Sequence, residues 1–179
     1  MRIFISGGCK NGKSTLARRL AVAQRALSGE LYYIATMVPT GDDDLRRIAR
    51  HRAERAGDGF TTLEQPRDVS SLIDTCDSGA SFLLDSLTAL LQNEMFRDGE
   101  IHCDAHVRVI AELTRLLDAA ENIVVVSDFI YADAGIYDAA TERYRECLAL
   151  VDRAAAERCD AVLEVCYSGI IVHKGELDL

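Results

Sequence analysis

Short apolar runs alternate along this chain with longer segments in which hydrophobic residues recur every three or four positions. The short runs are typical of buried strands and predict them at residues 2–6, 31–35, 81–84, 123–127, 161–165 and 170–173. The periodic segments predict helices over residues 13–28, 42–56, 86–96, 103–119 and 137–158. Strands that alternate with helices form a mostly parallel sheet with helices on both faces, so we expect a three-layer α/β protein.

The composition is that of a globular protein. The chain has 179 residues, 49% of them hydrophobic and 27% charged, and we expect residues 1–179 to form one domain. A formal net charge of -9 argues against broad binding to nucleic acid or to anionic membranes. No apolar run approaches the ~20 residues that span a bilayer, and no signal-peptide pattern is present. The six cysteines are scattered, which favours reduced thiols and a cytoplasmic location.

One motif indicates specific chemistry. Residues 7–14 read Gly-Gly-Cys-Lys-Asn-Gly-Lys-Ser, which satisfies the phosphate-loop pattern G-x-x-x-x-G-K-[ST] between a predicted strand and a predicted helix. Backbone N–H groups at the start of such a helix point at phosphate oxygens, and Lys13 would reach the terminal phosphates and assist catalysis. We therefore expect nucleotide binding by Gly7, Gly8, Cys9, Lys10, Asn11, Gly12, Lys13, Ser14 and Thr15.

Two oxygen ligands predict a Mg²⁺ site beside this loop. The Ser14 hydroxyl occupies the position that binds the metal ion in phosphate loops. Asp85 follows the buried run 81–84, where P-loop proteins carry a metal-binding carboxylate. Asp85 also precedes a predicted helix that starts near Ser86, so helix capping is an alternative or additional role that the sequence leaves open.

A histidine lies in a basic segment that a phosphate loop alone does not require. His51 is surrounded by five arginines within residues 46–55, a local positive patch suited to a second phosphate group. Like-charge repulsion from the arginines favours the neutral imidazole, whose lone pair could attack a phosphorus atom. On composition alone, an exposed helix face with an incidental histidine is the simpler interpretation.

Several motifs, taken in order along the chain, narrow the interpretation. They are Gly7-Gly8 at the phosphate loop, Tyr33-Ile34-Ala35-Thr36, Arg47-Ile48-x-x-His51-Arg52, Thr62-x-Glu64-x-Pro66, Leu83-Leu84-Asp85-Ser86-Leu87-Thr88 with Asn93 nearby, and Arg143-Tyr144-Arg145-Glu146. This ordered set resembles the bifunctional adenosylcobinamide kinase / adenosylcobinamide-phosphate guanylyltransferase family over essentially the whole chain.

The resemblance implies two reactions in the assembly of the cobalamin nucleotide loop. The family phosphorylates the aminopropanol hydroxyl of adenosylcobinamide, a corrinoid, with ATP or GTP. It then transfers GMP from GTP to that phosphate through a GMP-histidine intermediate and releases pyrophosphate. The resemblance also implies a RecA-like P-loop NTPase fold and a homotrimer.

The resemblance also implies site residues. His51 matches the guanylylated histidine of the family. The matching nucleotide contacts are Ala35, Thr36, Met37, Arg52, Ala53, Glu54, Arg55, Glu64 and Asp85.

The chain departs from the family pattern in its second half. After the run 123–127 the family reads N-E-V-G-x-G-x-x-P, whereas residues 127–135 here read Ser-Asp-Phe-Ile-Tyr-Ala-Asp-Ala-Gly, which keep an acid at Asp128. In the following helix an Asn-Gln pair of the family is Asp152-Arg153. These departures lie away from the nucleotide motifs, so they concern the kinase half and the corrinoid surface more than GTP binding.

Two other functions are compatible with part of this pattern. A P-loop kinase for another small alcohol would need Lys13, Ser14 and Asp85 but would not need His51. A GTP-binding regulatory subunit would bind the nucleotide without an acceptor and without a covalent adduct. Labelling of the protein by GTP identifies the guanylyltransferase, and phosphorylation of the corrinoid by an unlabelled protein separates the kinase from the regulatory subunit.

Overall fold

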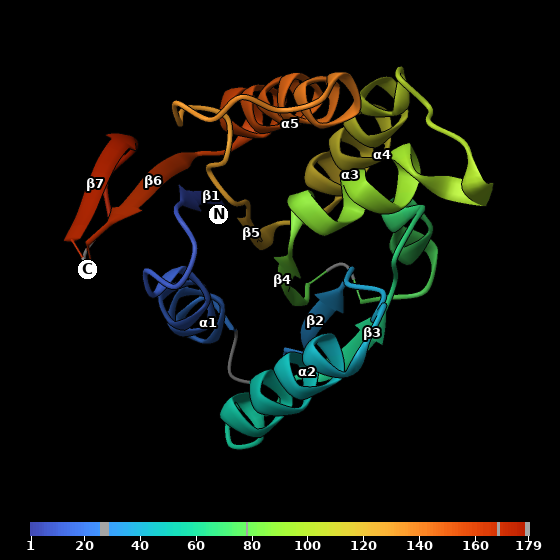
Figure 1. The fold of residues 1–179 in the computed structure, drawn as a ribbon. Helices are drawn as coiled ribbons and strands as arrows, with labels where there is room; N and C mark the ends of the chain where they lie inside the picture. Colours follow the sequence, from blue (N-terminus) through green and yellow to red (C-terminus); the bar gives the residue numbers. More distant parts are fainter. Residues whose placement is uncertain (26–28, 78, 168, 178–179) are drawn as a thin grey trace.

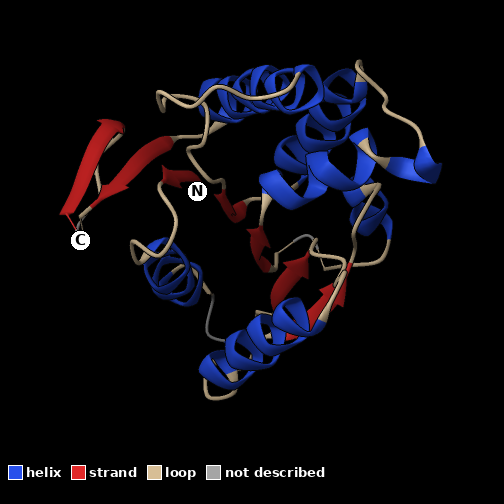
Figure 2. Ribbon diagram, in the orientation of Figure 1, coloured by secondary structure: helices blue, strands red, loops and turns tan. Residues whose placement is uncertain are grey.

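Helices cover both faces of a central sheet in the computed structural model, which describes residues 1–25, 29–77, 79–167 and 169–177 (Figures 1 and 2). The strands in these ranges are β1 (Arg2–Gly7), β2 (Leu31–Ala35), β3 (Thr61–Glu64), β4 (Ser81–Asp85), β5 (Asn122–Val126), β6 (Ala161–Cys166) and β7 (Gly169–Lys174). The α-helices are α1 (Lys13–Ala23), α2 (Asp42–Arg55), α3 (Leu87–Met95), α4 (Ala105–Ala119) and α5 (Ala139–Arg158). Short 3-10 helices occur at Val69–Asp74 and Arg97–Gly99.

The described strands form one sheet in the order β3-β2-β4-β5-β1-β6-β7. Neighbouring strands are parallel except β6 and β7, which are antiparallel. The carboxyl ends of β1, β2, β4 and β5 therefore meet at one edge of the sheet. In open parallel sheets ligands bind at this edge, in the loops that follow the strands.

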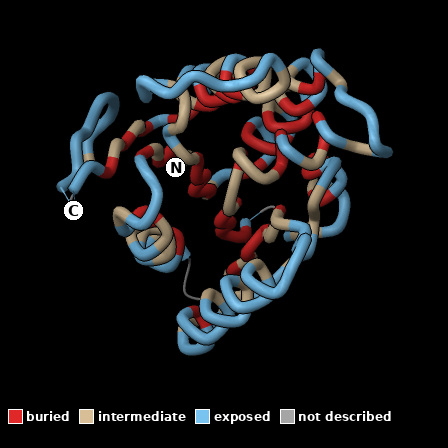
Figure 3. The backbone as a smooth tube through the Cα atoms, viewed as in Figure 1, coloured by how far each residue is buried: buried red, intermediate tan, exposed pale blue. Residues whose placement is uncertain are grey.

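Two apolar layers attach the helices to the sheet. On one face α3, α4 and α5 pack over a cluster that includes the fully buried Leu84 and Leu148. On the other face α1 packs through Ala17 and Ala21, one helical turn apart, against a cluster that includes Ile5. Figure 3 shows the central strands buried, whereas β7 is exposed along its whole length. Among the residues that the structure describes, no helix is both long enough and apolar enough to cross a membrane.

The structure confirms the α/β class and the mostly parallel sheet. Each strand predicted from an apolar run is present, and most helix ends lie within two residues of the prediction. The helix predicted over 137–158 starts at Ala139 because the Asp138 carboxylate accepts a hydrogen bond from the Thr141 N–H at 2.8 Å and caps it.

Two details of the prediction were wrong. The helix predicted over 13–28 ends at Ala23, and the Arg25 guanidinium then donates to the Gly29 carbonyl at 2.7 Å; residues 26–28 lie outside the described residues. The strand β3 was not predicted, because it has no apolar alternation. Three of its four residues are exposed, as an edge strand permits.

Candidate active site

The loop between β1 and α1 has the geometry of a phosphate-binding loop. Gly7 approaches β6 so closely that a Cβ atom would collide with the Val165 carbonyl oxygen. Gly12 begins the helix with a φ of 95°, a left-handed conformation that favours glycine. The Asn11 side chain donates to the Val165 carbonyl and accepts from the Lys13 N–H at 3.2 Å. The loop is therefore anchored to the neighbouring strand before a ligand binds.

A cavity of about 440 Å³ opens over this loop. It is lined by residues 9–15, by Arg47, Arg50, His51 and Glu54 of α2, and by Asp85, Val126 and Asp128 at the strand ends. Lys13 is buried, with 5% of its surface exposed. Its Nζ atom donates to the Gly8 carbonyl at 2.6 Å and lies 2.9 Å from Asp128 Oδ1. The ammonium group that is expected to meet the terminal phosphates is thus held at the cavity wall.

A second cavity, of about 270 Å³, lies between α2 and the ends of β2, β3 and β4. Its apolar wall includes Ala35, Met37 and Ile48, and its polar wall includes Arg52, Arg55, Glu64 and Asp85. His51, Arg47 and Asp85 line both this cavity and the cavity over the phosphate loop. A ligand with phosphates at one end and a flat ring at the other could occupy both.

A network built on Tyr33 fixes one side of the second cavity. The Tyr33 hydroxyl donates to Asp85 Oδ2 at 2.8 Å, and the guanidinium carbon of Arg55 lies 3.4 Å from the centre of the Tyr33 ring. The cation stacked on the aromatic face keeps the buried Arg55 in place. Burial, followed by the negative charge of Asp85, raises the pKa of Tyr33, so its hydroxyl remains a hydrogen-bond donor.

The histidine between the two cavities is half-buried and favours its neutral form. Burial is the main cause that lowers the pKa of His51; Arg47 and Arg50 lower it further, whereas Asp85 and Glu54 raise it. The sequence interpretation of a neutral imidazole agrees with this direction, but it named the arginines as the cause. The structure corrects the cause, because desolvation by the surrounding side chains comes first.

Asp85 does not cap α3. The Ser86 hydroxyl accepts the hydrogen bond from the Ala89 N–H at 3.3 Å and caps the helix instead. The Asp85 carboxylate faces the two cavities, with Tyr33 as its hydrogen-bond donor. The capping alternative is therefore wrong for Asp85.

The residues expected to bind a Mg²⁺ ion fit that role chemically. The Ser14 hydroxyl and the Asp85 carboxylate line the same cavity, and both are the hard oxygen ligands that Mg²⁺ prefers. Tyr33 occupies only one carboxylate oxygen of Asp85, so the other oxygen is available to a ligand. Proteins commonly hold Mg²⁺ with one or two such groups and complete its shell with phosphate oxygens and water.

Most, but not all, of the expected site residues line one of the two cavities. Those that do are Cys9, Lys10, Asn11, Gly12, Lys13, Ser14, Thr15, Ala35, Met37, His51, Arg52, Glu54, Arg55, Glu64 and Asp85. Gly7, Gly8, Thr36 and Ala53 do not line either cavity. Thr36 is fully buried, and its hydroxyl donates to the Ser86 carbonyl at 2.8 Å and accepts from the Ser86 N–H at 2.7 Å. Its side chain thus joins the ends of β2 and β4.

Tyr33 and Asp128 were not predicted as site residues, and Arg47 was predicted only as one of the five arginines of the positive patch. Arg47 lies one helical turn before His51 and faces both cavities, so i, i+4 spacing could have identified it. In the described part of the chain it forms no ion pair, whereas Arg52 is paired with Glu64. Asp128 follows a strand of the predicted sheet as Asp85 does, but only the strand order shows that β5 lies beside the phosphate-loop strand.

Fold and site together define a P-loop nucleotide-binding protein. The structure resembles a solved ATPase domain with a TM-score of 0.55 at 9% identity, over 97% of this chain and 76% of that one. It resembles the flagellar accessory protein FlaH of Methanocaldococcus jannaschii with a TM-score of 0.50 at 14% identity, over 98% and 78% of the two chains. At these identities the likeness concerns the fold alone, and it confirms the predicted P-loop fold class.

Sequence comparison gives the family. Residues 3–173 match the CobU family, described as cobinamide kinase / cobinamide phosphate guanyltransferase, and the chain belongs to this family. It is 34% identical over 164 residues to the bifunctional adenosylcobalamin biosynthesis protein CobP of Pseudomonas aeruginosa, a match that covers 90% of this chain and 91% of that protein. The resemblance that the sequence motifs indicated is confirmed.

Proposed function

We propose that this enzyme catalyses two successive transfers in cobalamin biosynthesis. It phosphorylates adenosylcobinamide with ATP or GTP, and it then transfers GMP from GTP to adenosylcobinamide phosphate. Family membership and the relation to CobP support this function. The observation that carries it is the position of His51, which lines the phosphate-loop cavity and the neighbouring cavity at once.

His51 is the proposed nucleophile of the guanylyl transfer. Its neutral imidazole forms a bond to the α-phosphorus of GTP, and the bond from that phosphorus to pyrophosphate breaks. Arg47 and Arg50 line the same cavity and offset the negative charge of the triphosphate. The phosphate of adenosylcobinamide phosphate then attacks the guanylylated histidine and frees it.

The second cavity is the proposed site for the guanine base. Its apolar wall suits a flat ring, and the Glu64 carboxylate can accept hydrogen bonds from the N–H groups at the edge of guanine. Arg52 pairs with Glu64 and holds this carboxylate at the cavity wall. Met37 and Ala35 belong to this apolar wall, and the family resemblance implies that both contact the nucleotide.

We propose that Ser14 and Asp85 hold Mg²⁺ beside the phosphates. Bound there, the ion supplies positive charge that stabilises the leaving pyrophosphate or nucleoside diphosphate. The Tyr33 hydroxyl orients the Asp85 carboxylate for this role.

Product analysis tests the two activities. The wild type is expected to convert adenosylcobinamide and ATP into the phosphate ester, and to form the GDP-linked corrinoid after addition of GTP. His51→Ala should still form the first product but not the second. His173→Ala is a matched control, because His173 of β7 pairs with Glu164 of β6 and lines neither cavity. A protein that forms only the ester would be a kinase, and one that forms neither product would support the regulatory alternative.

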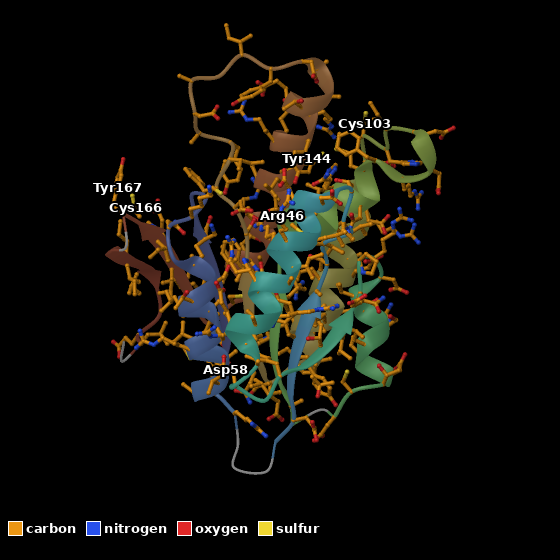
Figure 4. All side chains as sticks on the ribbon, turned by 60° about the horizontal axis from the view of Figure 1, so that its bottom comes forward. Arg46, Asp58, Cys103, Tyr144, Cys166 and Tyr167 are labelled. Atoms are coloured by element: carbon orange, nitrogen blue, oxygen red, sulfur yellow. The ribbon has the colours of Figure 1, made fainter. Side chains whose placement is uncertain are left out.

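We propose further that the protein is a cytoplasmic homotrimer. The hairpin of β6 and β7 extends to one side of the sheet (Figures 1 and 4), with Ile170, Ile171 and Val172 each 38% to 49% exposed. Such an exposed apolar strand is a surface that a neighbouring subunit could cover. The free state of all six cysteines supports a reducing compartment. Light scattering should give three times the chain mass, and a fully active monomer at micromolar concentration would contradict this assembly.

A further inference from the structure

Asp128 is an acidic residue of the phosphate-loop cavity that neither reaction described above uses. It follows β5 directly, and its backbone N–H donates to the Thr88 hydroxyl at 2.9 Å, which fixes the start of the loop. Its carboxylate lies 2.9 Å from the Lys13 ammonium, and 26% of its side chain is exposed. Asp128 is thus both immobilised and accessible from the cavity.

The position of Lys13 places Asp128 beside the reacting phosphate. The phosphate-loop lysine contacts the terminal phosphates of a bound nucleotide. A carboxylate in contact with the same ammonium group therefore borders the position of the γ-phosphate. An acceptor hydroxyl that approaches this phosphate has to enter the space next to Asp128.

The other two carboxylates of the cavity are less suited to take a proton from that hydroxyl. Asp85 accepts the Tyr33 hydrogen bond and is the proposed metal ligand. Glu54 projects from α2, where it lies 3.8 Å from Arg50. Asp128 alone among these three contacts the phosphate-loop lysine in the described part of the chain.

We propose that Asp128 is the general base of the kinase step. The acceptor oxygen forms a bond to the γ-phosphorus while the bond from that phosphorus to the β,γ-bridging oxygen breaks. The bridging electron pair leaves with the nucleoside diphosphate, and the hydroxyl proton passes to the Asp128 carboxylate. Because Asp128 is partly exposed, the proton then passes to solvent. This inference rests on the proposed kinase activity and assigns a residue to it.

The chemistry of the two reactions predicts that only one of them needs this base. An alcohol is a weak nucleophile until it loses its proton. A neutral imidazole attacks through a lone pair that is already free, and a phosphate group at neutral pH carries no proton that must be removed before it attacks. Loss of the Asp128 carboxylate should therefore slow phosphorylation of the corrinoid and spare guanylyl transfer.

Asp128→Asn separates the two activities. The amide keeps the size of the side chain but cannot accept the proton. We expect kcat for phosphorylation of adenosylcobinamide to fall on the order of 10² to 10⁴-fold, with KM for ATP within about fivefold of wild type. Labelling of His51 by α-labelled GTP, and GMP transfer to supplied adenosylcobinamide phosphate, should stay within about fivefold of wild type.

Two further variants complete the test. Asp128→Glu retains a base and should keep much more kinase activity than Asp128→Asn. Asp118→Asn changes an exposed acid that pairs with Arg158 outside both cavities, and it should leave both activities unchanged.

Three outcomes would overturn the proposal. Kinase activity of Asp128→Asn within about threefold of wild type would show that no base is needed at this position. Equal loss of kinase activity and His51 labelling would show that Asp128 only positions Lys13. A wild type that labels His51 but phosphorylates no corrinoid would overturn the kinase activity itself, and with it this role.

Discussion

The nucleotide edge of the sheet and the groove under α5 both contain buried polar side chains, but their hydrogen bonding differs. At the nucleotide edge Lys13 has the Gly8 carbonyl and Asp128 as partners, and Asp85 accepts from Tyr33. In the groove, of about 380 Å³, Asp152 is 3% exposed. Its Oδ2 accepts from the Tyr131 hydroxyl at 3.1 Å, whereas its Oδ1 has no partner among the residues that the structure describes.

This difference in hydrogen bonding coincides with where the chain keeps the family motifs and where it departs from them. The nucleotide edge keeps the phosphate-loop and histidine motifs of the family, and Lys13, Arg50 and Arg52 there each lie beside a carboxylate. The groove lies where the chain departs from those motifs, and Asp152 stands where the family has an amide. The departing segment 127–135 was expected to lie away from the nucleotide motifs, which is wrong for Asp128, because this residue lines the phosphate-loop cavity. Burial raises the pKa of Asp152 to about 7, because its charged form would lie in the protein interior with one oxygen unpaired among the described residues. The polar groups of the proposed nucleotide site are therefore held in place by their partners, whereas Asp152 is kept at the expense of stability near neutral pH.

Replacement of Lys13 should have the largest effect on the nucleotide edge. Lys13→Ala removes the cation that meets the terminal phosphates and leaves Asp128 without its partner. We expect both activities to fall on the order of 10³-fold and GTP affinity to weaken. Calorimetric titration and product assays measure this. GTP affinity and turnover equal to those of wild type would refute the assignment of the phosphate loop.

Replacement of Asp152 should raise stability rather than lower activity. Between about pH 4 and pH 7 the folded protein keeps a proton on Asp152 that the unfolded chain has lost, so wild-type stability falls as pH rises through this range. Asp152→Asn removes the titratable carboxyl group but keeps a side-chain oxygen that can accept the hydrogen bond from Tyr131. Its free energy of unfolding should exceed that of wild type by an amount that grows with pH, up to about 4 kcal/mol.

Urea unfolding of both proteins at pH 4, 5.5, 7 and 8 measures this difference. Asp118→Asn is a control, because Asp118 is exposed and lies 2.9 Å from Arg158 at the surface. A difference between Asp152→Asn and wild type that does not change with pH would show that Asp152 ionises normally in the folded protein.

Loss of the Tyr33 hydroxyl should have the smallest effect of these changes. Tyr33→Phe keeps the ring under Arg55 but removes the hydrogen bond to Asp85. Hydrogen bonds to a charged group contribute about 1.5 to 3 kcal/mol, so we expect activity to fall about ten- to a hundredfold. The loss should be smaller at high Mg²⁺ concentration, because Tyr33 acts through Asp85. A Mg²⁺ titration of initial rates tests this, and an unchanged Mg²⁺ dependence would contradict it.

The sequence predicted the nucleotide edge better than the rest of the molecule. The phosphate loop could be identified because its residues are contiguous, and His51 because of its place in an ordered set of motifs. Asp128 could not, since its contact with Lys13 depends on the neighbouring positions of β1 and β5 in the sheet. The edge strand β3 is mostly exposed, so its sequence does not alternate between apolar and polar residues. The burial of Asp152 could not be predicted either, because it depends on how α5 packs over Tyr131.

The covalent use of His51 is the central claim, and labelling with GTP tests it most directly. GTP labelled at the α-phosphate should leave label on the wild-type protein while pyrophosphate is released, and γ-labelled GTP should leave none by this route. The bond to nitrogen should survive denaturation in alkali and break in acid. His51→Ala should remain unlabelled, whereas His173→Ala should label normally. Retention of α-label by His51→Ala, or its absence from a wild type that forms the GDP-linked corrinoid, would contradict the account.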